Sequence, residues 1–399
     1  MIELLAPAGD LEKLKVAVMY GADAVFIGGK KFSLRARASN FGIKEIREGC
    51  EFARKYNAKV YVTMNIVPHG EDFEGIEDYL VELVDAGVTG VIISSIAYAN
   101  IIKKIAPTLE LHLSTQFSAS NSETIKMFEE LGFSRVVLAR ETSLKQIEEI
   151  KKKTNAELEI FIHGGMCVAY SGRCMLSNHM TNRDANRGGC AHSCRWNYKL
   201  TKDGVLQHQE DEYLNMGSKD LMAINAITKM IDIGVKSLKI EGRMKSVYYI
   251  ATVVRCYRML IDEYLKTGRL ENIDFYIQEI QKAETRQAAT GFLHNKVGPN
   301  EQLYNVRNDV PTKEFLGIVL AYDDETQIAT LEQRNYFEIN EEVEFFGPKL
   351  KNTNFVIGEM YDEEMNELDV ARHPKQIIKI KVPFKLKPWD MLRKANYAN

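Results

Sequence analysis

The sequence predicts an α/β protein: a closed (β/α)₈ barrel of the TIM type, followed by a small C-terminal all-β barrel domain. Through the first two-thirds of the 399 residues, short apolar segments alternate with amphipathic helical patterns, as in a parallel barrel. From about residue 313 the pattern changes to short segments of alternating polarity, which predict antiparallel strands. We expect the barrel at 1–270, a helical and irregular linker at 271–312, and the second domain at 313–399.

Eight predicted strands are rich in Val, Ile and Leu, as strands buried on both faces are. They lie at residues 2–6, 24–28, 59–64, 90–94, 110–114, 135–139, 159–163 and 237–241. Asp10 is placed to cap the first helix, and Gly21 to end it. An open doubly wound sheet is the alternative, but no Gly-rich phosphate loop follows the first strand.

The connection after the seventh strand is the longest. A helix near 219–233 leaves an insertion at 164–218, and insertions of this length are usually functional. The insertion starts at the carboxyl ends of the strands, where barrels place their active sites. It contains four of the six cysteines.

These four residues, Cys167, Cys174, Cys190 and Cys194, follow the spacing C-x₆-C-x₁₅-C-x₃-C in a Gly-rich segment. Four thiolates on one such segment can converge on a single metal centre. Structural zinc is the main alternative, but zinc favours two close ligand pairs, and the first spacing here is wide. Spacing alone gives an iron–sulfur cluster a slight advantage over zinc.

Net charge, apolar runs and cysteine content limit the classes of protein to which this chain can belong. The net charge of −3 excludes a polycation that coats nucleic acid, so an RNA site must be a local patch. No apolar run approaches the roughly 20 residues of a membrane span, and the N-terminus lacks the pattern of a signal peptide. We therefore expect a cytoplasmic protein, in which cysteines serve metal binding or catalysis. Cys50 and Cys256, on predicted helices, are expected to be packing residues.

Polar residues follow the predicted strands at the end where a barrel has its active site. His112, His163 and Glu241 are the candidate catalytic residues, because a histidine or carboxylate there could act as general acid or base. Each histidine could equally be a hydrogen-bonded core residue. Asn65 and Gln116 could hydrogen-bond a pyrimidine edge, with satisfied rim amides as the alternative.

The insertion also predicts an RNA contact. The insertion interleaves cations with an aromatic residue: the cations are Arg173, Arg183, Arg187 and Arg195, and the aromatic residue is Trp196. This composition suits single-stranded RNA with splayed bases, although Trp196 could instead pack on the barrel. A second basic stretch includes Lys379 and Lys381, whose charges alternate with apolar residues. Phosphate contact and protection of a sheet edge are the two interpretations of that alternation.

The chain resembles the collagenase-like peptidases of unassigned catalytic type. The resemblance rests on the stretch EIFIHGGMCVAYSGRCMLS at 159–177, on LAPAGD at 5–10, on HLSTQ at 112–116 and on KIEGRMKS at 239–246. It extends over nearly the whole chain, including the C-terminal β region. Within that family, the chain is most similar to the bacterial tRNA hydroxylation proteins.

The resemblance implies formation of 5-hydroxyuridine at the tRNA wobble position, with the anticodon loop as partner and prephenate as an oxygen-independent co-substrate. It also implies a [4Fe–4S] cluster on the four cysteines of the insertion, and therefore the iron–sulfur assembly machinery as a further partner. Whether a homologous subunit is needed does not follow from the sequence. Prephenate is a dicarboxylate, which guanidinium groups or lysines would bind. The candidates for that role are Arg35, Arg37, Arg140, Lys239 and Arg243, with rim salt bridges to Glu141 and Glu241 as the alternative.

Three functions therefore compete: an RNA hydroxylase with an iron–sulfur cluster, a peptidase, and a non-catalytic RNA-binding or cluster-carrying protein. The cysteine insertion favours the first over the second, and the chain has neither an HExxH helix nor a GxSxG elbow. The polar strand ends favour an enzyme over a binding module. Another RNA, or an aromatic ring, remains the alternative substrate.

Overall fold

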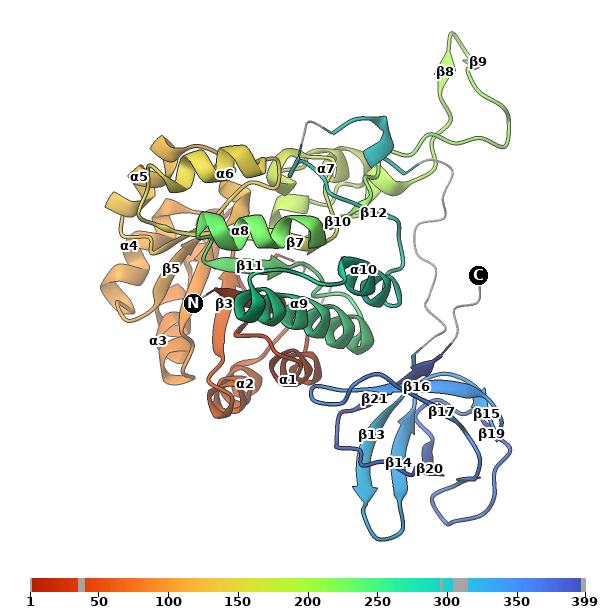
Figure 1. The fold of residues 1–399 in the computed structure, drawn as a ribbon. Coiled ribbons are helices and arrows are strands. Elements are labelled where there is room, and N and C mark those ends of the chain that lie inside the picture. Colours follow the sequence, from red (N-terminus) through yellow and green to blue (C-terminus); the bar gives the residue numbers. More distant parts are fainter. Residues whose placement is uncertain (1, 35–39, 295–296, 304–314, 396–399) are drawn as a thin grey trace.

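The computed structural model describes residues 2–34, 40–294, 297–303 and 315–395. A barrel wrapped by helices forms the larger part, and an all-β domain lies beside it (Figure 1). Both parts of the predicted fold are confirmed. Two of the predicted substrate-binding residues, Arg35 and Arg37, lie outside the described residues.

Eight parallel strands close into a ring, because β11 pairs with both β1 and β7. Their bounds are β1 Glu3–Pro7, β2 Ala24–Gly28, β3 Lys59–Met64, β4 Gly90–Ile93, β5 Glu110–Leu113, β6 Arg135–Val137, β7 Glu157–Gly164 and β11 Ser237–Ile240. All eight predicted strands are thus present, with ends shifted by at most two residues. Their carboxyl ends point to one face, which carries the cysteine insertion.

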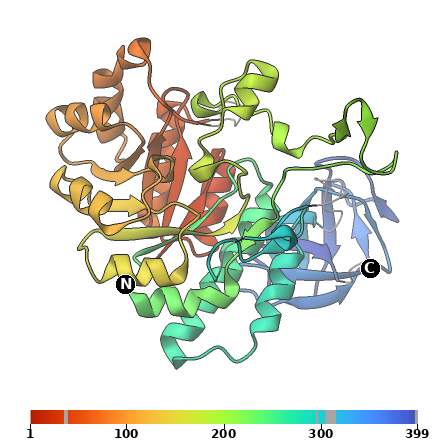
Figure 2. The same cartoon turned by 90° about the horizontal axis from the view of Figure 1, so that it is seen from above.

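Helices pack around the outside of this barrel (Figure 2). They are α1 Leu11–Met19, α2 Ile43–Lys55, α3 Ile76–Asp85, α4 Ile96–Ile105, α5 Ser122–Glu130, α6 Leu144–Lys151, α8 Ile227–Ile233 and α9 Val247–Thr267, and α10 Ile273–Gln281 packs on α9. The Asp10 side chain caps α1 by accepting the Lys13 N–H at 2.9 Å, as predicted. Within the described residues, no helix is long and apolar enough to cross a membrane.

The predicted helix near 219–233 is wrong in its first half. Residues Asp220–Met222 form a short strand, β10, whose Leu221 and Met222 pair antiparallel with the end of β7. β12 Ala288–Ala289 then pairs with β10. Local sequence did not reveal this strand, because both of its partners are distant in the chain. The rest of the insertion holds α7 Leu176–Thr181 and the hairpin β8 Thr201–Lys202 with β9 Val205–Leu206.

Buried charges fill the barrel interior near the amino-terminal ends of the strands. The Arg135 guanidinium, 1% exposed, contacts the carboxylates of Glu3, Glu157 and Glu159. Glu159 also accepts a hydrogen bond from the Lys239 ammonium group at 2.7 Å. Each buried charge therefore has an opposite partner, as burial in a low-dielectric interior requires. Lys239 is the member of this network that also lines the cavity at the carboxyl ends of the strands, where it forms part of the floor.

The C-terminal domain is a seven-stranded antiparallel sheet in the order β17-β16-β21-β13-β14-β20-β18, with a two-stranded β15–β19 pair. The strands are β13 Phe315–Asp323, β14 Ile328–Gln333, β15 Phe337–Glu338, β16 Glu342–Phe346, β17 Thr353–Val356, β18 Met360–Tyr361, β19 Val370–Ala371, β20 Ile377–Lys381 and β21 Met391–Lys394. Arg393 of β21 binds Glu279 of α10 at 2.8 Å, and Phe315 stacks on Tyr248 of α9. These contacts join the domain to the helices around the barrel.

Candidate functional site

A cavity of about 680 Å³ opens at the carboxyl ends of the barrel strands, between the barrel and the cysteine insertion. Phe26, Thr63 and Ile92 of the barrel strands contribute to its floor. The insertion contributes Cys167, Cys190 and other residues to the opposite wall. The cavity therefore joins the two features that the sequence singled out, the polar strand ends and the cysteines.

All four cysteines of the insertion are free thiols and partly buried. Burial raises the pKa of Cys167, and the nearby Cys174 and Cys190 thiols raise it further. The pKa of Cys194 is raised in the same way, by burial and then by the other three thiols. The thiols thus lie within electrostatic range of one another. Cys50 and Cys256 are buried on α2 and α9, as expected for packing residues.

The donors that the insertion offers near the cysteines are four thiols and one buried hydroxyl. The hydroxyl of Ser193, which precedes Cys194, is buried and has no hydrogen-bond partner in the described part of the chain. A buried hydroxyl without a partner indicates a missing acceptor. An iron–sulfur cluster, which spans its thiolates and accepts hydrogen bonds at sulfur, fits these observations.

Two contacts dock the insertion onto the barrel. Arg187 forms a two-pronged ion pair with Asp72 of the β3–α3 connection, one prong of it at 3.1 Å. This guanidinium holds the pKa of Asp72 below its usual range. On the other side, the Glu141 carboxylate accepts the Ser171 backbone N–H at 2.9 Å. The cysteines are therefore held on the barrel rim from two directions.

Six cations line the cavity, whereas Glu241 is the one carboxylate in its described lining. The cations are Arg140, Arg195, Lys239, Arg243, Lys245 and Arg286. Arg140 stacks on Phe161, 3.8 Å from the ring centroid, and donates to Glu241 at 3.3 Å. Carboxylates outside the lining balance part of this charge, because Glu159 pairs with Lys239 and Asp220 with Arg286. The lining itself still presents more cations than carboxylates, which favours an anionic ligand.

Arg243 fixes the connection after β2. Its guanidinium donates to Ser33 Oγ at 3.1 Å, to the Leu34 carbonyl at 3.0 Å and to Asn40 Oδ1 at 2.5 Å. These three acceptors flank the positions of Arg35 and Arg37. Arg243 therefore contributes to the site in part by holding Leu34, which lines the cavity.

The two predicted amides both line the cavity. Asn65 Oδ1 accepts the Leu34 N–H at 3.2 Å, which fixes its orientation and leaves Nδ2 as a donor. Gln116 is 7% exposed, and its Oε1 has no hydrogen-bond partner in the described part of the structure. The pair therefore offers one donor and one acceptor to a planar polar ligand.

Neither predicted catalytic histidine lines the cavity. His112 is buried inside the barrel, bonded to Glu110 at 3.1 Å and packed on Tyr61. His163 points to α9, where Tyr257 contacts its Nδ1 at 3.3 Å, and burial lowers its pKa to about 3. Both positions suit the core-histidine alternative, and a catalytic role for either stays a prediction.

The predicted RNA-binding residues fall into four groups. Arg173 and Trp196 are exposed on the insertion, and the Trp196 ring stacks on Tyr198. Arg183 donates to the Cys190 carbonyl at 3.3 Å, and Arg187 is engaged with Asp72. Those two therefore stabilise the insertion itself.

Arg195 lines the cavity and forms part of its wall. Lys379 and Lys381 lie on β20 of the other domain. Lys379 donates to the Glu363 carbonyl at 2.7 Å, and the exposed Lys381 ammonium is 3.9 Å from Glu359. RNA contact by these residues stays a prediction.

Sequence reasoning missed several residues of the cavity. Arg286 reaches it from the segment after α10 and is paired with Asp220 of β10 at 2.7 Å. Lys245 donates to Thr285 at 3.0 Å beside that pair. The KIEGRMKS stretch could have indicated Lys245, but no local signal marks Arg286, because the β10–β12 pairing brings it there.

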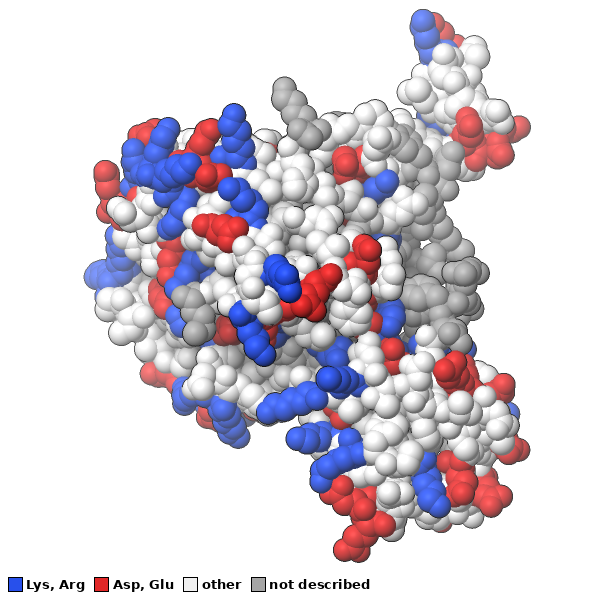
Figure 3. All heavy atoms as spheres, in the orientation of Figure 1, with Lys and Arg blue, Asp and Glu red and all other residues white. Residues whose placement is uncertain are grey.

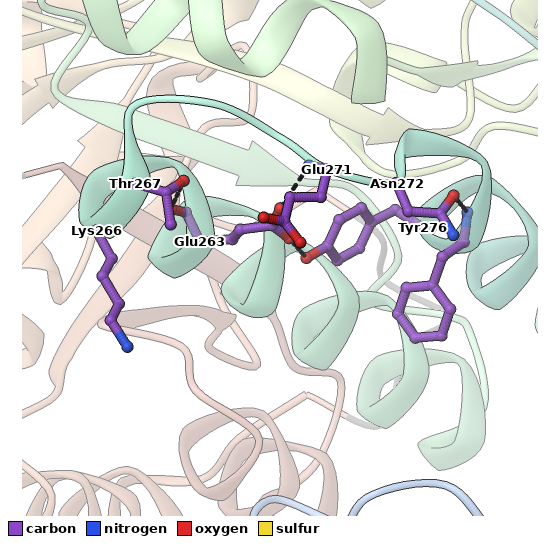
Figure 4. A pocket seen from close by; sticks show the side chains of 7 residues that line it. Glu263, Lys266, Thr267, Glu271, Asn272 and Tyr276 are labelled. Carbon is purple, nitrogen blue, oxygen red and sulfur yellow. Dashed lines mark hydrogen bonds between the residues drawn. The ribbon is translucent and has the colours of Figure 1, made fainter.

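A second hollow, of about 440 Å³, lies between the end of α9 and α10 (Figure 4). Glu263 accepts hydrogen bonds there from the Tyr276 hydroxyl and from the Glu271 N–H. The residues that line this hollow and those that line the cavity do not overlap. Its polar groups bind one another, which indicates a structural role.

Comparison with known proteins gives a consistent result along the chain. The model described as Peptidase family U32 matches residues 9–303, and that of the Peptidase family U32 C-terminal domain matches residues 311–393. The chain is 52% identical to tRNA hydroxylation protein P1 of Bacillus subtilis, covering 98% of this chain and 94% of the relative. It is 30% identical to tRNA hydroxylation protein P of Escherichia coli, covering 96% and 94%. It is also 32% identical to a protein named Collagenase from Porphyromonas gingivalis, covering 98% and 97%.

Proposed function

The chain belongs to peptidase family U32, and on that premise we propose that it is an RNA hydroxylase that forms 5-hydroxyuridine at the wobble position of tRNA. The observation that most supports this function is one cavity lined both by cysteines and by six cations. A relative named for tRNA hydroxylation is 52% identical over nearly its whole length. A relative named Collagenase is 32% identical, well below that value and level with the 30% of the Escherichia coli tRNA hydroxylation protein.

Replacing the C5 hydrogen of uracil by a hydroxyl group oxidises the base, which side chains cannot do without a cofactor. Cys167, Cys174, Cys190 and Cys194 would hold a [4Fe–4S] cluster, which supplies redox chemistry when bound. The chain's own residues then bind, orient and shield the reactants. Polar contacts between these residues and the base would be stronger inside the cavity than in bulk water.

The cations of the cavity would bind the carboxylates of prephenate, our proposed co-substrate. Arg140 is best placed, because stacking on Phe161 and the bond to Glu241 fix its planar guanidinium. Gln116 Oε1 would accept an N–H of the uracil edge, and Asn65 Nδ2 would donate to a uracil carbonyl. Glu241, the single carboxylate of the described lining, would hold or release the proton that the base loses.

The test is nucleoside analysis of tRNA from a bacterium that lacks its own wobble hydroxylase and expresses this chain. We expect 5-hydroxyuridine at the wobble position with the wild-type chain, and none with Cys167→Ser produced at an equal level. Uridine left unmodified by both chains would contradict the proposal. Cleavage of gelatin by the purified wild-type chain in that case would favour the peptidase.

A further inference from the structure

Three large apolar side chains are exposed at the mouth of the cavity. Tyr170 is 52% exposed, Trp196 42% and Met244 57%. Met244 lines the cavity itself, and the other two directly adjoin the lining residues Ser171 and Arg195. Three separate segments of the chain therefore give the cavity an apolar rim. We call Tyr170, Trp196 and Met244 the mouth platform.

Tyr170 stands beside a strained backbone position. Ser171, the next residue, is 2% exposed and has a φ of 51°, in the left-handed region that residues other than glycine rarely adopt. The Glu141 carboxylate accepts the Ser171 N–H at 2.9 Å and so helps to hold this conformation. Backbone strain of this kind clusters at functional sites. The strain therefore points to a function for the exposed ring next to it.

The other two side chains of the mouth platform also stand on a fixed backbone. Arg243, which precedes Met244, donates to three acceptors in the connection after β2. The Arg195 carbonyl, which adjoins Trp196, accepts a hydrogen bond from Asn215 Nδ2 at 3.0 Å. Apolar side chains on a rigid backbone lose little conformational freedom when a ligand covers them. The mouth platform is therefore suited to binding.

Charge favours a polyanion with apolar faces as the ligand of the mouth platform. The part of the insertion that carries the two aromatic residues, 164–196, has four arginines against one aspartate. Arg187 pairs with Asp72, which leaves three arginines against that aspartate. The arm that follows, 197–216, has two lysines against four carboxylates, and Figure 3 shows acidic side chains at two places on it. Phosphates are therefore attracted to the segment beside the cavity and not to the arm.

We propose that the mouth platform binds unpaired nucleotides next to the target base, whose bases stack on Tyr170 and Trp196 and contact Met244. Every base has a flat apolar face, and aromatic side chains bind such faces with little regard to sequence. A methionine thioether also contacts aromatic rings favourably. Bases inside a duplex already stack on one another, so the mouth platform restricts the enzyme to loops and single strands. The inference rests on the proposed function, because it says how the RNA substrate of that cavity is selected.

Tryptophan fluorescence of the full-length chain tests the mouth platform directly, because Trp196 is one of two tryptophans. In a Trp389→Phe chain, the emission reports on Trp196 alone. We expect quenching by an RNA stem-loop with uridine at the wobble position of its loop. We expect no quenching by the same loop sequence annealed to its complement. Equal quenching by both RNAs, or none by the bound stem-loop, would overturn the inference.

Binding of the same stem-loop to Tyr170→Ala is the second measurement. We expect the affinity to fall about tenfold, as the loss of one stacked base produces. Tyr56→Ala is the matched control, because Tyr56 is 51% exposed and follows α2, at the amino-terminal end of the barrel. We expect Tyr56→Ala to bind the stem-loop as the wild type does.

Failure of this inference can be told apart from failure of the proposed function. If Tyr170→Ala binds the stem-loop and hydroxylates tRNA as the wild type does, the mouth platform is wrong and the hydroxylase stands. If the wild-type chain binds neither the stem-loop nor the duplex, both are wrong.

Discussion

Asn186 holds Cys174 with both ends of its side-chain amide. Its Oδ1 accepts the Cys174 N–H at 3.3 Å, and its Nδ2 donates to the Cys174 carbonyl at 3.2 Å. The backbone carbonyl of Asn186 accepts the Val67 N–H at 3.0 Å. One residue therefore joins a proposed cluster ligand to the barrel connection that also carries Asn65.

Replacing Asn186 by alanine should weaken cluster retention, because Cys174 loses the groups that orient its backbone. Loss of such a supporting contact typically lowers metal affinity roughly 10- to 100-fold. Iron release to a chelator under anaerobic conditions measures the effect. Asn178→Ala, in the neighbouring helix α7, is the control and should release iron at the wild-type rate. Equal rates for the two variants would show that Asn186 does not position Cys174.

Arg140→Lys should impair binding of the anionic co-substrate while the fold stays intact. Lysine keeps the charge but loses the planar fork and the stacking on Phe161. We expect KM for the dicarboxylate to rise about tenfold, which corresponds to about 1.4 kcal/mol of lost binding. Steady-state kinetics measures it, with Arg269→Lys, which is exposed and outside the described cavity lining, as control. An unchanged KM for Arg140→Lys would remove Arg140 from the binding site.

Arg135→Met should destabilise the barrel by about 3–5 kcal/mol, because the Glu3 carboxylate loses its buried cation and Glu159 keeps only Lys239. Urea denaturation followed by circular dichroism measures the change. Lys126→Met removes an exposed pair with Glu123 and should stay within about 0.5 kcal/mol of the wild type. Similar midpoints for the two variants would contradict the assigned role of the buried network.

Glu284→Gln should change how stability depends on pH. Burial, and then the negative charge of Asp220, raise the pKa of Glu284 to about 7. In an unfolded chain it is about 4.3, so between these values the folded state binds more protons and the free energy of unfolding falls as pH rises. The variant should gain in thermal midpoint relative to the wild type across this window and level off above about pH 7. If the thermal midpoints of the variant and the wild type followed parallel curves against pH, the prediction would be wrong.

The eight barrel strands were predictable because each is a short apolar segment with a helix pattern after it. Strand β10 was not, because its residues gain their partners only when the end of β7 and the β12 segment meet them. The position of the cavity followed from the rule that barrel sites lie at strand ends, and its lining includes the predicted residues Arg140, Gln116 and Glu241.

Side-chain partners were harder to predict. Arg187 has the sequence context of an RNA contact, yet it pairs with Asp72, 115 positions away. His163 lies in one of the motifs that carry the family resemblance, at the end of a predicted strand. Its side chain nevertheless points to Tyr257, at a place where the register between β7 and β11 shifts. Such pairings depend on the closed barrel, which no local pattern encodes.

The most direct test of the account is anaerobic purification of the wild-type chain, followed by an absorption spectrum with iron and sulfide analysis. We predict about four irons and four sulfides per chain, with both lost in Cys167→Ser. Zinc in place of iron, or a chain that holds no cluster after anaerobic reconstitution, would contradict the central claim that the cysteine insertion makes this barrel a redox enzyme.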